Sequence, residues 1–141
     1  MNRRAIGVLG LALAALSLAA APLPTVYEAA VLGTIVPAAL LRAVAIVESA
    51  ERDHAVGDDG ISVGRYQLNE LYHAERAGRW GEYDPRDPLA AGYVAARILQ
   101  DNLRLLGTWE LAIAAYRQGI RGVEDSGPTA WYVERVWRAW R

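Results

Sequence analysis

The chain has 141 residues, 53% of them hydrophobic, which is enough for one domain with a compact core. Its 15 basic residues are all arginines and nearly balance 16 acidic residues, so the formal net charge is −1. Because no basic tail or stripe stands out, binding to nucleic acid through phosphate neutralisation has little support. The absence of cysteine excludes disulfide bonds, thiolate metal sites and a cysteine nucleophile.

Residues 1–21 have the composition of an export signal. Arg3 and Arg4 precede a run without charged residues, which ends in the small residues Ala19 to Ala21. This pattern predicts a signal peptide that is cleaved near its end, and a retained N-terminal membrane anchor is the alternative. We therefore expect residues 22–141 to form a domain that works outside the cytoplasm, in the periplasm or in the extracellular space.

Nearly every segment after Pro24 has helical character. The first is short, apolar and interrupted by Gly33. The second begins at Pro37 and is apolar around most of its circumference, which indicates burial. The patterns predict helices within the segments 26–35, 37–50, 63–76, 87–107, 108–119 and 127–141.

Two of these helices carry clear end signals. Asp87 is the expected cap of the helix that begins at Pro88, and Gly107 is its expected stop. Thr108 is the expected cap of the next helix. Because no segment has convincing strand character, we predict a compact all-α domain with, at most, a minor β-hairpin near residues 55–65.

Glu48 occupies a position that needs an explanation. Leu41, Val44 and Ala45 lie seven, four and three positions before it, so Glu48 lies at the end of an apolar stripe. Burial of an unpartnered carboxylate is costly and raises its pKa, and a glutamic acid that is protonated near neutral pH suits general-acid catalysis. The alternative is that Glu48 turns to solvent or pairs with an arginine such as Arg52, and helix position alone does not decide.

Two later segments carry groups that suit a sugar ligand. Gln67 has both a donor and an acceptor for sugar hydroxyls or an acetamido group, and Gly64 permits close backbone approach. Tyr116 lies just before Gly119 at a predicted helix end, from which its phenol could reach a buried carboxylate.

These residues resemble the lysozyme-like superfamily, specifically the soluble lytic transglycosylase (SLT) domains that cleave bacterial peptidoglycan. The resemblance covers about residues 36–136, and the turn "GDDGISVGRYQL" is also similar to goose-type and invertebrate lysozymes. Four motifs occur in the family's order, "VES", "VGRYQL", "DP" and "AAYRQG", which contain Glu48-Ser49, Gly64 and Gln67, Asp87-Pro88, and Ala115-Tyr116.

The resemblance implies a lysozyme-like fold and a lytic transglycosylase with Glu48 as its single acid and base. Glu48 would protonate the glycosidic oxygen between N-acetylmuramic acid and N-acetylglucosamine. It would then take the proton of the muramic C6 hydroxyl while a 1,6-anhydro ring closes. Tyr116 would orient Glu48, and Ser49 would support Glu48 or place an acetamido group. Gln67 would line the cleft.

A lysozyme-type hydrolase of the same bond is the alternative activity. Such an enzyme needs a second carboxylate to hold a water molecule. The local candidates are Asp53, Asp58 and Asp59, for which the favoured interpretation is that they are solvated turn residues.

Three features depart from the family pattern. Arg65 and Tyr66 replace a Leu-Met pair, which changes the floor of the expected cleft, and Tyr66 is interpreted equally as a sugar-stacking face or as a core aromatic. Arg117 replaces an asparagine, and the proline that often follows Glu-Ser is absent. Arg117 motivates a third interpretation, a glycan-binding module that keeps the cleft but has lost turnover.

The remaining aromatic residues and histidines carry weaker signals. Trp80 and Tyr83 are interpreted as a stacking rim or as loop packing, and His54 and His73 have no zinc-like partner pattern. We expect no metal and no cofactor. The expected partner is the peptidoglycan glycan strand, with membrane contact only if the N-terminal segment is retained. The tryptophans expected to be core or helix-docking residues are Trp109, Trp131, Trp137 and Trp140.

Overall fold

A computed structural model of the chain describes residues 21–141. The predicted signal segment, apart from Ala21, lies outside the described residues, so its cleavage or retention stays a prediction. The described elements are α1 (Val26–Ala30), α2 (Ala38–Ser49), β1 (Val56–Gly57), η1 (Asp58–Gly60), β2 (Ser62–Val63), β3 (Leu68–Asn69), η2 (Glu70–Tyr72), α3 (His73–Trp80), α4 (Pro88–Leu106), α5 (Trp109–Ser126) and α6 (Ala130–Trp140). None of the helices between residues 21 and 141 is long and apolar enough to span a membrane.

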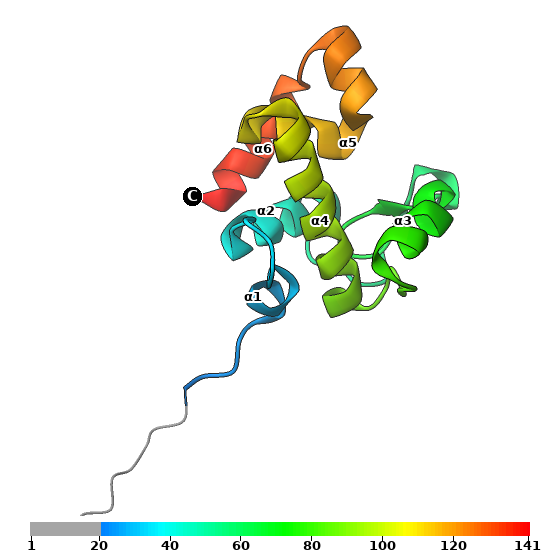
Figure 1. Ribbon diagram of the computed structural model, residues 1–141, viewed down its shortest axis with the longest axis vertical. Helices are drawn as coiled ribbons and strands as arrows, with labels where there is room; N and C mark the ends of the chain where they lie inside the picture. Colours follow the sequence, from blue (N-terminus) through cyan, green and yellow to red (C-terminus); the bar gives the residue numbers. More distant parts are fainter. Residues whose placement is uncertain (1–20) are drawn as a thin grey trace, which may run out of the picture.

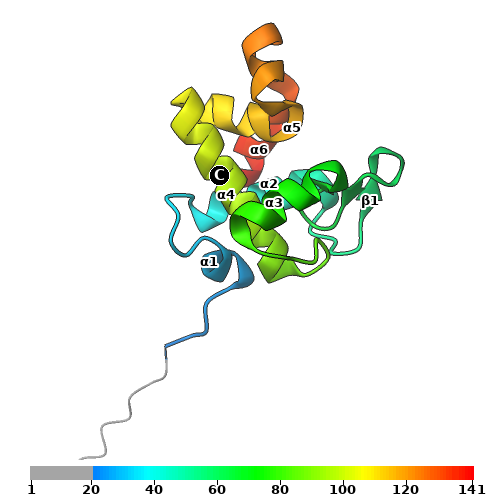
Figure 2. The same ribbon diagram turned by 45° about the vertical axis from the view of Figure 1, so that its right-hand side comes forward.

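Helix α4 crosses the middle of the molecule and joins its two sides (Figure 1). It packs against α1 near its start and against α5 near its end, while α2 packs against α6. The three strands and α3 lie together on one side of α4, which is clearest in Figure 2. The predicted lysozyme-like helical class is confirmed, with one small antiparallel sheet in the order β1-β2-β3.

The core lies where α2, α4, α5 and α6 meet. Residues of α2 at the predicted apolar stripe are fully buried, which explains why this helix forms despite having no side-chain cap at Pro37. Each large apolar side chain removed from water contributes about 1.5 to 3 kcal/mol. Fully buried large side chains of these four helices are Leu40, Leu41, Val44, Val94, Leu99, Ile113, Tyr132 and Val136.

The predicted ends of α4 are confirmed. The Asp87 carboxylate accepts hydrogen bonds from the backbone N–H groups of Leu89 and Ala90 at 2.9 and 2.7 Å. Gly107 ends the helix with a φ of +84°, a left-handed conformation that glycine adopts without steric cost.

The predicted cap of α5 is also confirmed, whereas its end differs from the prediction. Thr108 accepts a hydrogen bond from the backbone of Leu111 at 3.3 Å. Gly119 interrupts the helix with φ +77° and ψ +163°, and helical structure then resumes as far as Ser126. The glycine is therefore a kink between two helical stretches.

The predicted helix over residues 63–76 is wrong in its first half. Gly64 and Gln67 have φ values of +80° and +47°, and these left-handed conformations do not occur inside a right-handed helix. The chain instead forms β2 and β3, with Val63 paired to both Val56 and Leu68. The predicted hairpin near residues 55–65 exists and gains a third strand, and helix α3 begins only at His73.

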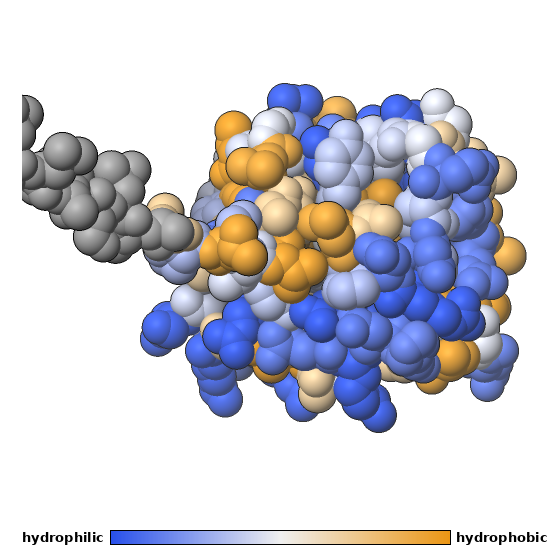
Figure 3. Space-filling model, turned by 90° about the horizontal axis from the view of Figure 1, so that it is seen from below, coloured by the Kyte–Doolittle hydropathy of each residue, from blue (hydrophilic) through white to orange (hydrophobic). Residues whose placement is uncertain are grey.

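Hydrophobic side chains gather around the point where the described chain begins, on the face seen in Figure 3. Exposed hydrophobic residues of the turn after α1 and of the start of α4 include Leu32, Ile35, Leu89 and Tyr93. This face is separate from the polar cavity described next.

Candidate functional site

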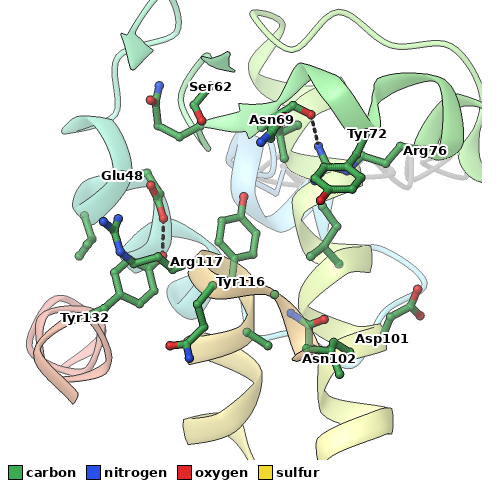
Figure 4. Close-up of a pocket in the computed structure, with 18 of the residues that line it drawn as sticks. Glu48, Ser62, Asn69, Tyr72, Arg76, Asp101, Asn102, Tyr116, Arg117 and Tyr132 are labelled. Atoms are coloured by element: carbon green, nitrogen blue, oxygen red, sulfur yellow. Dashed lines mark hydrogen bonds between the residues drawn. The ribbon is translucent and has the colours of Figure 1, made fainter. Parts of the chain in front are cut away.

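A cavity of about 960 Å³ lies between the helices of the core and the strand region, a volume in the range of ligand-binding sites. Its lining comes from α2, β2, β3, α3, α4, α5 and α6 (Figure 4). Segments that are far apart in the sequence therefore supply its two walls.

Glu48 projects from the last turn of α2 into this cavity (Figure 4). The hydroxyl of Tyr132, on α6, donates a hydrogen bond to Glu48 Oε1. Arg52 is not its partner, because the Arg52 guanidinium donates to the backbone oxygen of Ser49 at 2.8 Å. Glu48 is partly buried, so it does not turn freely into bulk solvent.

The pKa of Glu48 is raised above its usual value, and burial is the main cause. The hydrogen bond from Tyr132 and the positive charge of Arg117 favour the carboxylate and oppose this shift, while the negative charge of Asp58 adds to it. Glu48 therefore keeps its proton to higher pH than an exposed glutamate, as general-acid chemistry requires.

The phenol that hydrogen-bonds Glu48 belongs to Tyr132 and not to the predicted Tyr116. The Tyr116 hydroxyl donates to the backbone oxygen of Tyr66 at 2.8 Å, which ties α5 to the turn between β2 and β3. Tyr116 still lines the cavity, between Arg117 and Asn102 in Figure 4. The contact between α2 and α6, rather than the end of α5, supplies the phenol for the carboxylate.

Ser49 has a structural position behind Glu48. Its buried hydroxyl donates to the backbone oxygen of Arg65 at 2.8 Å and accepts from the backbone N–H of Arg52 at 3.0 Å. Since Ser49 does not line the cavity, its predicted contact with an acetamido group finds no support. Ser49 instead joins the end of α2 to the strand region.

The close backbone approach predicted at Gly64 is present, although the neighbour is protein. A Cβ atom at this position would lie 1.9 Å from the backbone oxygen of Pro85. Gln67 does line the cavity, and its side-chain N–H groups donate to the backbone oxygens of Gly64 and Ala55 at 3.0 and 3.3 Å. Both residues shape the strand region that forms one wall.

Arg65 and Tyr66 do not change the floor of the cavity, contrary to the prediction, because neither lines it. Tyr66 is fully buried, so the core interpretation is correct, and its ring lies against Gly92, where a Cβ atom would be 2.9 Å from the Tyr66 hydroxyl. Arg65 points to the other side, where it donates to Asp53 at 2.7 Å and to Tyr27 at 2.8 Å.

Asp58 is the carboxylate of the strand region that lines the same cavity as Glu48. It accepts a hydrogen bond from the Ser62 hydroxyl at 2.6 Å. Asp53 is paired with Arg65, and Asp59 is exposed outside the cavity, so both are structural or solvated as expected.

Arg117 and Trp131 form a second feature of the cavity. The guanidinium carbon of Arg117 lies 4.7 Å from the centre of the Trp131 ring and 5.6 Å from that of Tyr132. Trp131 is 49% exposed, so its prediction as a core or docking residue is wrong. The other three tryptophans of that group pack against the core, and Trp140 stacks on Trp137 with ring centres 4.9 Å apart.

The two aromatic residues of the connection before α4 have different surroundings. Trp80 packs against the core, so its packing interpretation is correct, and it also lines the cavity, where its role as a stacking rim stays a prediction. Tyr83 does not line this cavity, and its ring lies 4.5 Å from that of His73. Tyr83 therefore follows the packing interpretation.

Two important residues were missed by the sequence analysis, Tyr132 and Gln118. The Gln118 side chain donates to the backbone oxygen of Gly127 at 2.8 Å and accepts from the backbone N–H of Thr129 at 2.9 Å. It thereby fixes the start of α6 against the kink of α5. A tyrosine on the apolar face of the last helix was the available signal, because a buried phenol usually has a hydrogen-bond partner.

Within residues 21–141, no three side chains of the His, Cys, Asp and Glu types come close enough together to hold a metal ion.

Comparisons with known proteins agree with this geometry. The invasion protein IagB of Salmonella typhimurium and that of Salmonella typhi are each 31% identical to the chain over 109 residues. The match covers 72% of this chain and 66% of those proteins, so it spans slightly less than two thirds of their length. The family described as Transglycosylase SLT domain matches residues 26–129. The chain therefore belongs to the Transglycosylase SLT domain family, as the motifs around Glu48, Gln67 and Tyr116 predicted.

Proposed function

We propose that this protein is a lytic transglycosylase that cleaves the β-1,4 bond between N-acetylmuramic acid and N-acetylglucosamine in peptidoglycan. The observation that carries the proposal is the partly buried Glu48 carboxyl, with a raised pKa and a phenol partner, on the wall of a cavity in an SLT-family domain.

In the first step the proton of Glu48 passes to the glycosidic oxygen while the bond from that oxygen to the muramic C1 breaks. N-acetylglucosamine leaves with a free C4 hydroxyl. In the second step the Glu48 carboxylate takes the proton of the muramic C6 hydroxyl, whose oxygen forms a bond to C1. The product is a 1,6-anhydro sugar, no water is consumed, and Glu48 ends protonated again.

The surroundings of Glu48 suit both steps. Burial and the negative charge of Asp58 favour the protonated form that begins the cycle. Tyr132 and Arg117 stabilise the carboxylate that forms once the proton has left. An acid that must also act as a base works best when its pKa is close to the working pH, so influences on both forms of Glu48 suit the proposed role.

A hydrolase of the same bond is the second candidate, and Asp58 is the observation that favours it. Asp58 lines the cavity with Glu48 and acts on its pKa, so its carboxylate could hold an attacking water. Asp58 is bonded to Ser62 within a loop where its own φ is +50°, and we infer from this that its role is to shape the loop.

Digestion of purified peptidoglycan tests the proposal. Wild-type protein should release 1,6-anhydro-muropeptides, Glu48→Gln should release none, and Asp58→Asn should retain the anhydro product. Products with reducing muramic ends, lost in Asp58→Asn, would establish the hydrolase instead. If the wild type binds peptidoglycan but releases no products, the result would support a glycan-binding module instead of an enzyme.

We also propose that the domain acts outside the cytoplasm, because the composition of residues 1–21 is that of an export signal. N-terminal sequencing of the protein from the producing cell would locate the start of the mature chain. A chain that begins at Met1 and fractionates with membranes would indicate a retained anchor.

A further inference from the structure

Arg117, Trp131 and Arg135 form a cationic patch on the cavity wall where α5 meets α6. The guanidinium carbons of Arg117 and Arg135 lie 4.7 and 5.9 Å from the centre of the same Trp131 ring. All three side chains are exposed, and all three line the cavity that contains Glu48. The aromatic ring holds the two guanidinium groups at its surface without neutralising either charge.

Neither arginine of this patch is in an ion pair with any residue between 21 and 141. The positive charge of Arg117 lowers the pKa of the nearby Glu48 carboxyl. The hydrogen bond that Glu48 accepts comes from Tyr132 and not from an arginine. Two arginines at one ring, close to a reacting group and without a carboxylate partner, have the donors for an incoming anion.

At the other end of the cavity each arginine has a polar partner, and Asp101 is shared by two of them. Arg79 lies 2.5 Å from one oxygen of Asp101, and Arg104 lies 4.0 Å from the other. Arg76 is occupied differently, since it donates to the backbone oxygen of Asn69 at 3.0 Å. Among the arginines of the described residues that line the cavity, only Arg117 and Arg135 have neither a hydrogen bond nor an ion pair.

The glycan backbone of peptidoglycan has no free charge in its hydroxyl and acetamido groups. Free carboxylates come from the muramic acid side, either from the peptide attached to its lactyl group or, where that peptide has been removed, from the lactyl group itself. Uncharged side chains would bind the hydroxyl and acetamido groups of the sugar rings equally well. The sugar rings alone therefore do not explain a patch of unpaired arginines.

We propose that the patch of Arg117, Trp131 and Arg135 binds a carboxylate carried by the muramic acid unit, on the attached peptide or on the lactyl group. This inference rests on the proposed function, because it assumes that peptidoglycan occupies the cavity. The guanidinium groups bind the carboxylate through charge-assisted hydrogen bonds, and the exposed Trp131 ring supplies an apolar surface beside it. The site selects substituted glycan over uncharged oligosaccharide.

Binding to peptidoglycan immobilised on a solid support tests this inference in the Glu48→Gln background, where bound substrate is not turned over. Three preparations are compared: native peptidoglycan, peptidoglycan with its carboxylates converted to amides, and strands whose peptides have been removed by an amidase. We expect Glu48→Gln to bind the native material about tenfold more tightly than the amidated material. Raising the salt concentration should weaken binding to native peptidoglycan and leave binding to amidated peptidoglycan nearly unchanged.

The added substitution Arg117→Gln should remove most of that difference, and Arg135→Gln should remove part of it. Arg121→Gln is the matched control, because it deletes the same charge from an exposed position of the same helix that does not line the cavity. Loss of affinity on stripping would assign the anion to the peptide. The lactyl carboxyl is amide-linked in native material and free only in stripped strands, so tighter binding of stripped strands than of native material would assign the anion to the lactyl group.

The inference is overturned if native peptidoglycan, amidated peptidoglycan and stripped strands all bind equally, if none of them binds, or if Arg121→Gln has the same effect as Arg117→Gln. Its failure is distinguishable from failure of the proposed function. Release of anhydro-muropeptides by the wild type without a preference for carboxylates would contradict only the role of the patch. Carboxylate-dependent binding without release would support the role of the patch and contradict the proposed enzyme activity.

Discussion

The two ends of the cavity are built from the same residue types and differ in how the charges are used. At the α3 and α4 end, arginines are paired with Asp101 or bound to a backbone oxygen. At the α5 and α6 end, Arg117 and Arg135 are unpaired, and a partly buried carboxyl is bonded to a phenol (Figure 4). An exposed ion pair contributes little to the stability of the fold, about 0 to 1 kcal/mol. An unpaired charge beside a partly buried acid, in contrast, changes the pKa of that acid.

Under the proposed function, this difference favours the α5 and α6 end, which carries Glu48's phenol partner, as the place of the chemistry. It also explains why composition alone says little, since a net charge of −1 hides a local surplus of positive charge. Four substitutions sharpen or break this comparison.

The largest effect is expected for Glu48→Gln, which should lower the rate of peptidoglycan cleavage by about 10² to 10⁴-fold. The same variant should be more stable than wild type at pH 7. The raised pKa of Glu48 means that stability is fully present at low pH and is lost as pH rises through the raised pKa, a loss that glutamine does not suffer. Chemical denaturation at pH 4 and pH 7 measures this, and a stability gain that is equal at both pH values would contradict it.

Tyr132→Phe should lower activity roughly tenfold, since a hydrogen bond to the reacting carboxyl is removed. Because Tyr132 favours the ionised form, its loss should raise the pKa of Glu48 further and move the alkaline limb of the pH–rate profile to higher pH. Tyr116→Phe is the matched control at the cavity, and it should destabilise the fold without moving that limb. A shift in Tyr116→Phe alone would assign the positioning role to Tyr116 after all.

Gln118→Ala should lower the free energy of unfolding by about 1 to 2 kcal/mol, because hydrogen bonds between the α5 kink and the start of α6 are lost. Activity should fall as well, since α6 carries Tyr132, but by less than in Tyr132→Phe. Gln100→Ala is the control, because Gln100 accepts a hydrogen bond from the backbone N–H of Ile35, outside the cavity, at 3.0 Å. Equal activity loss at equal stability loss in both variants would show that Gln118 acts only through stability.

The smallest effect is expected for Asp101→Asn, at the paired end. It should change the free energy of unfolding by less than about 1 kcal/mol, because the ion pairs with Arg79 and Arg104 are partly exposed. It should also make peptidoglycan binding more dependent on salt, since two arginines lose their partner. A large loss of activity would mean that the two ends share the chemistry.

Much of the helical framework followed from local signals. The cap at Asp87, the stop at Gly107 and the cap at Thr108 depend on side chains that bond neighbouring backbone groups, so a short window of sequence contains the whole interaction. The helix predicted across Gly64 was wrong because the apolar spacing fits a helix, whereas Gly64 and Gln67 adopt left-handed conformations that interrupt one. Glutamine is not a residue type that favours a positive φ, so the conformation of Gln67 could not be predicted from its identity.

The candidate site was predictable only in part for the same reason. Glu48 is detectable because its apolar stripe lies within one helix, and the family motifs extend to Tyr116. Tyr132 lies three positions beyond the segment matched by the family and 84 residues from Glu48. No local pattern connects them.

The sequence by itself determined the α-helical class, the start and stop of α4, the position of Glu48 at the end of an apolar stripe, and the family. Each of these depends on residues close together in the chain or on motifs of fixed order. The tertiary structure alone decided which phenol meets the carboxyl, which arginines keep a free charge and which tyrosine is core. Those properties depend on the packing of α6 on α2 and on the distances between groups that the chain brings together only when it folds.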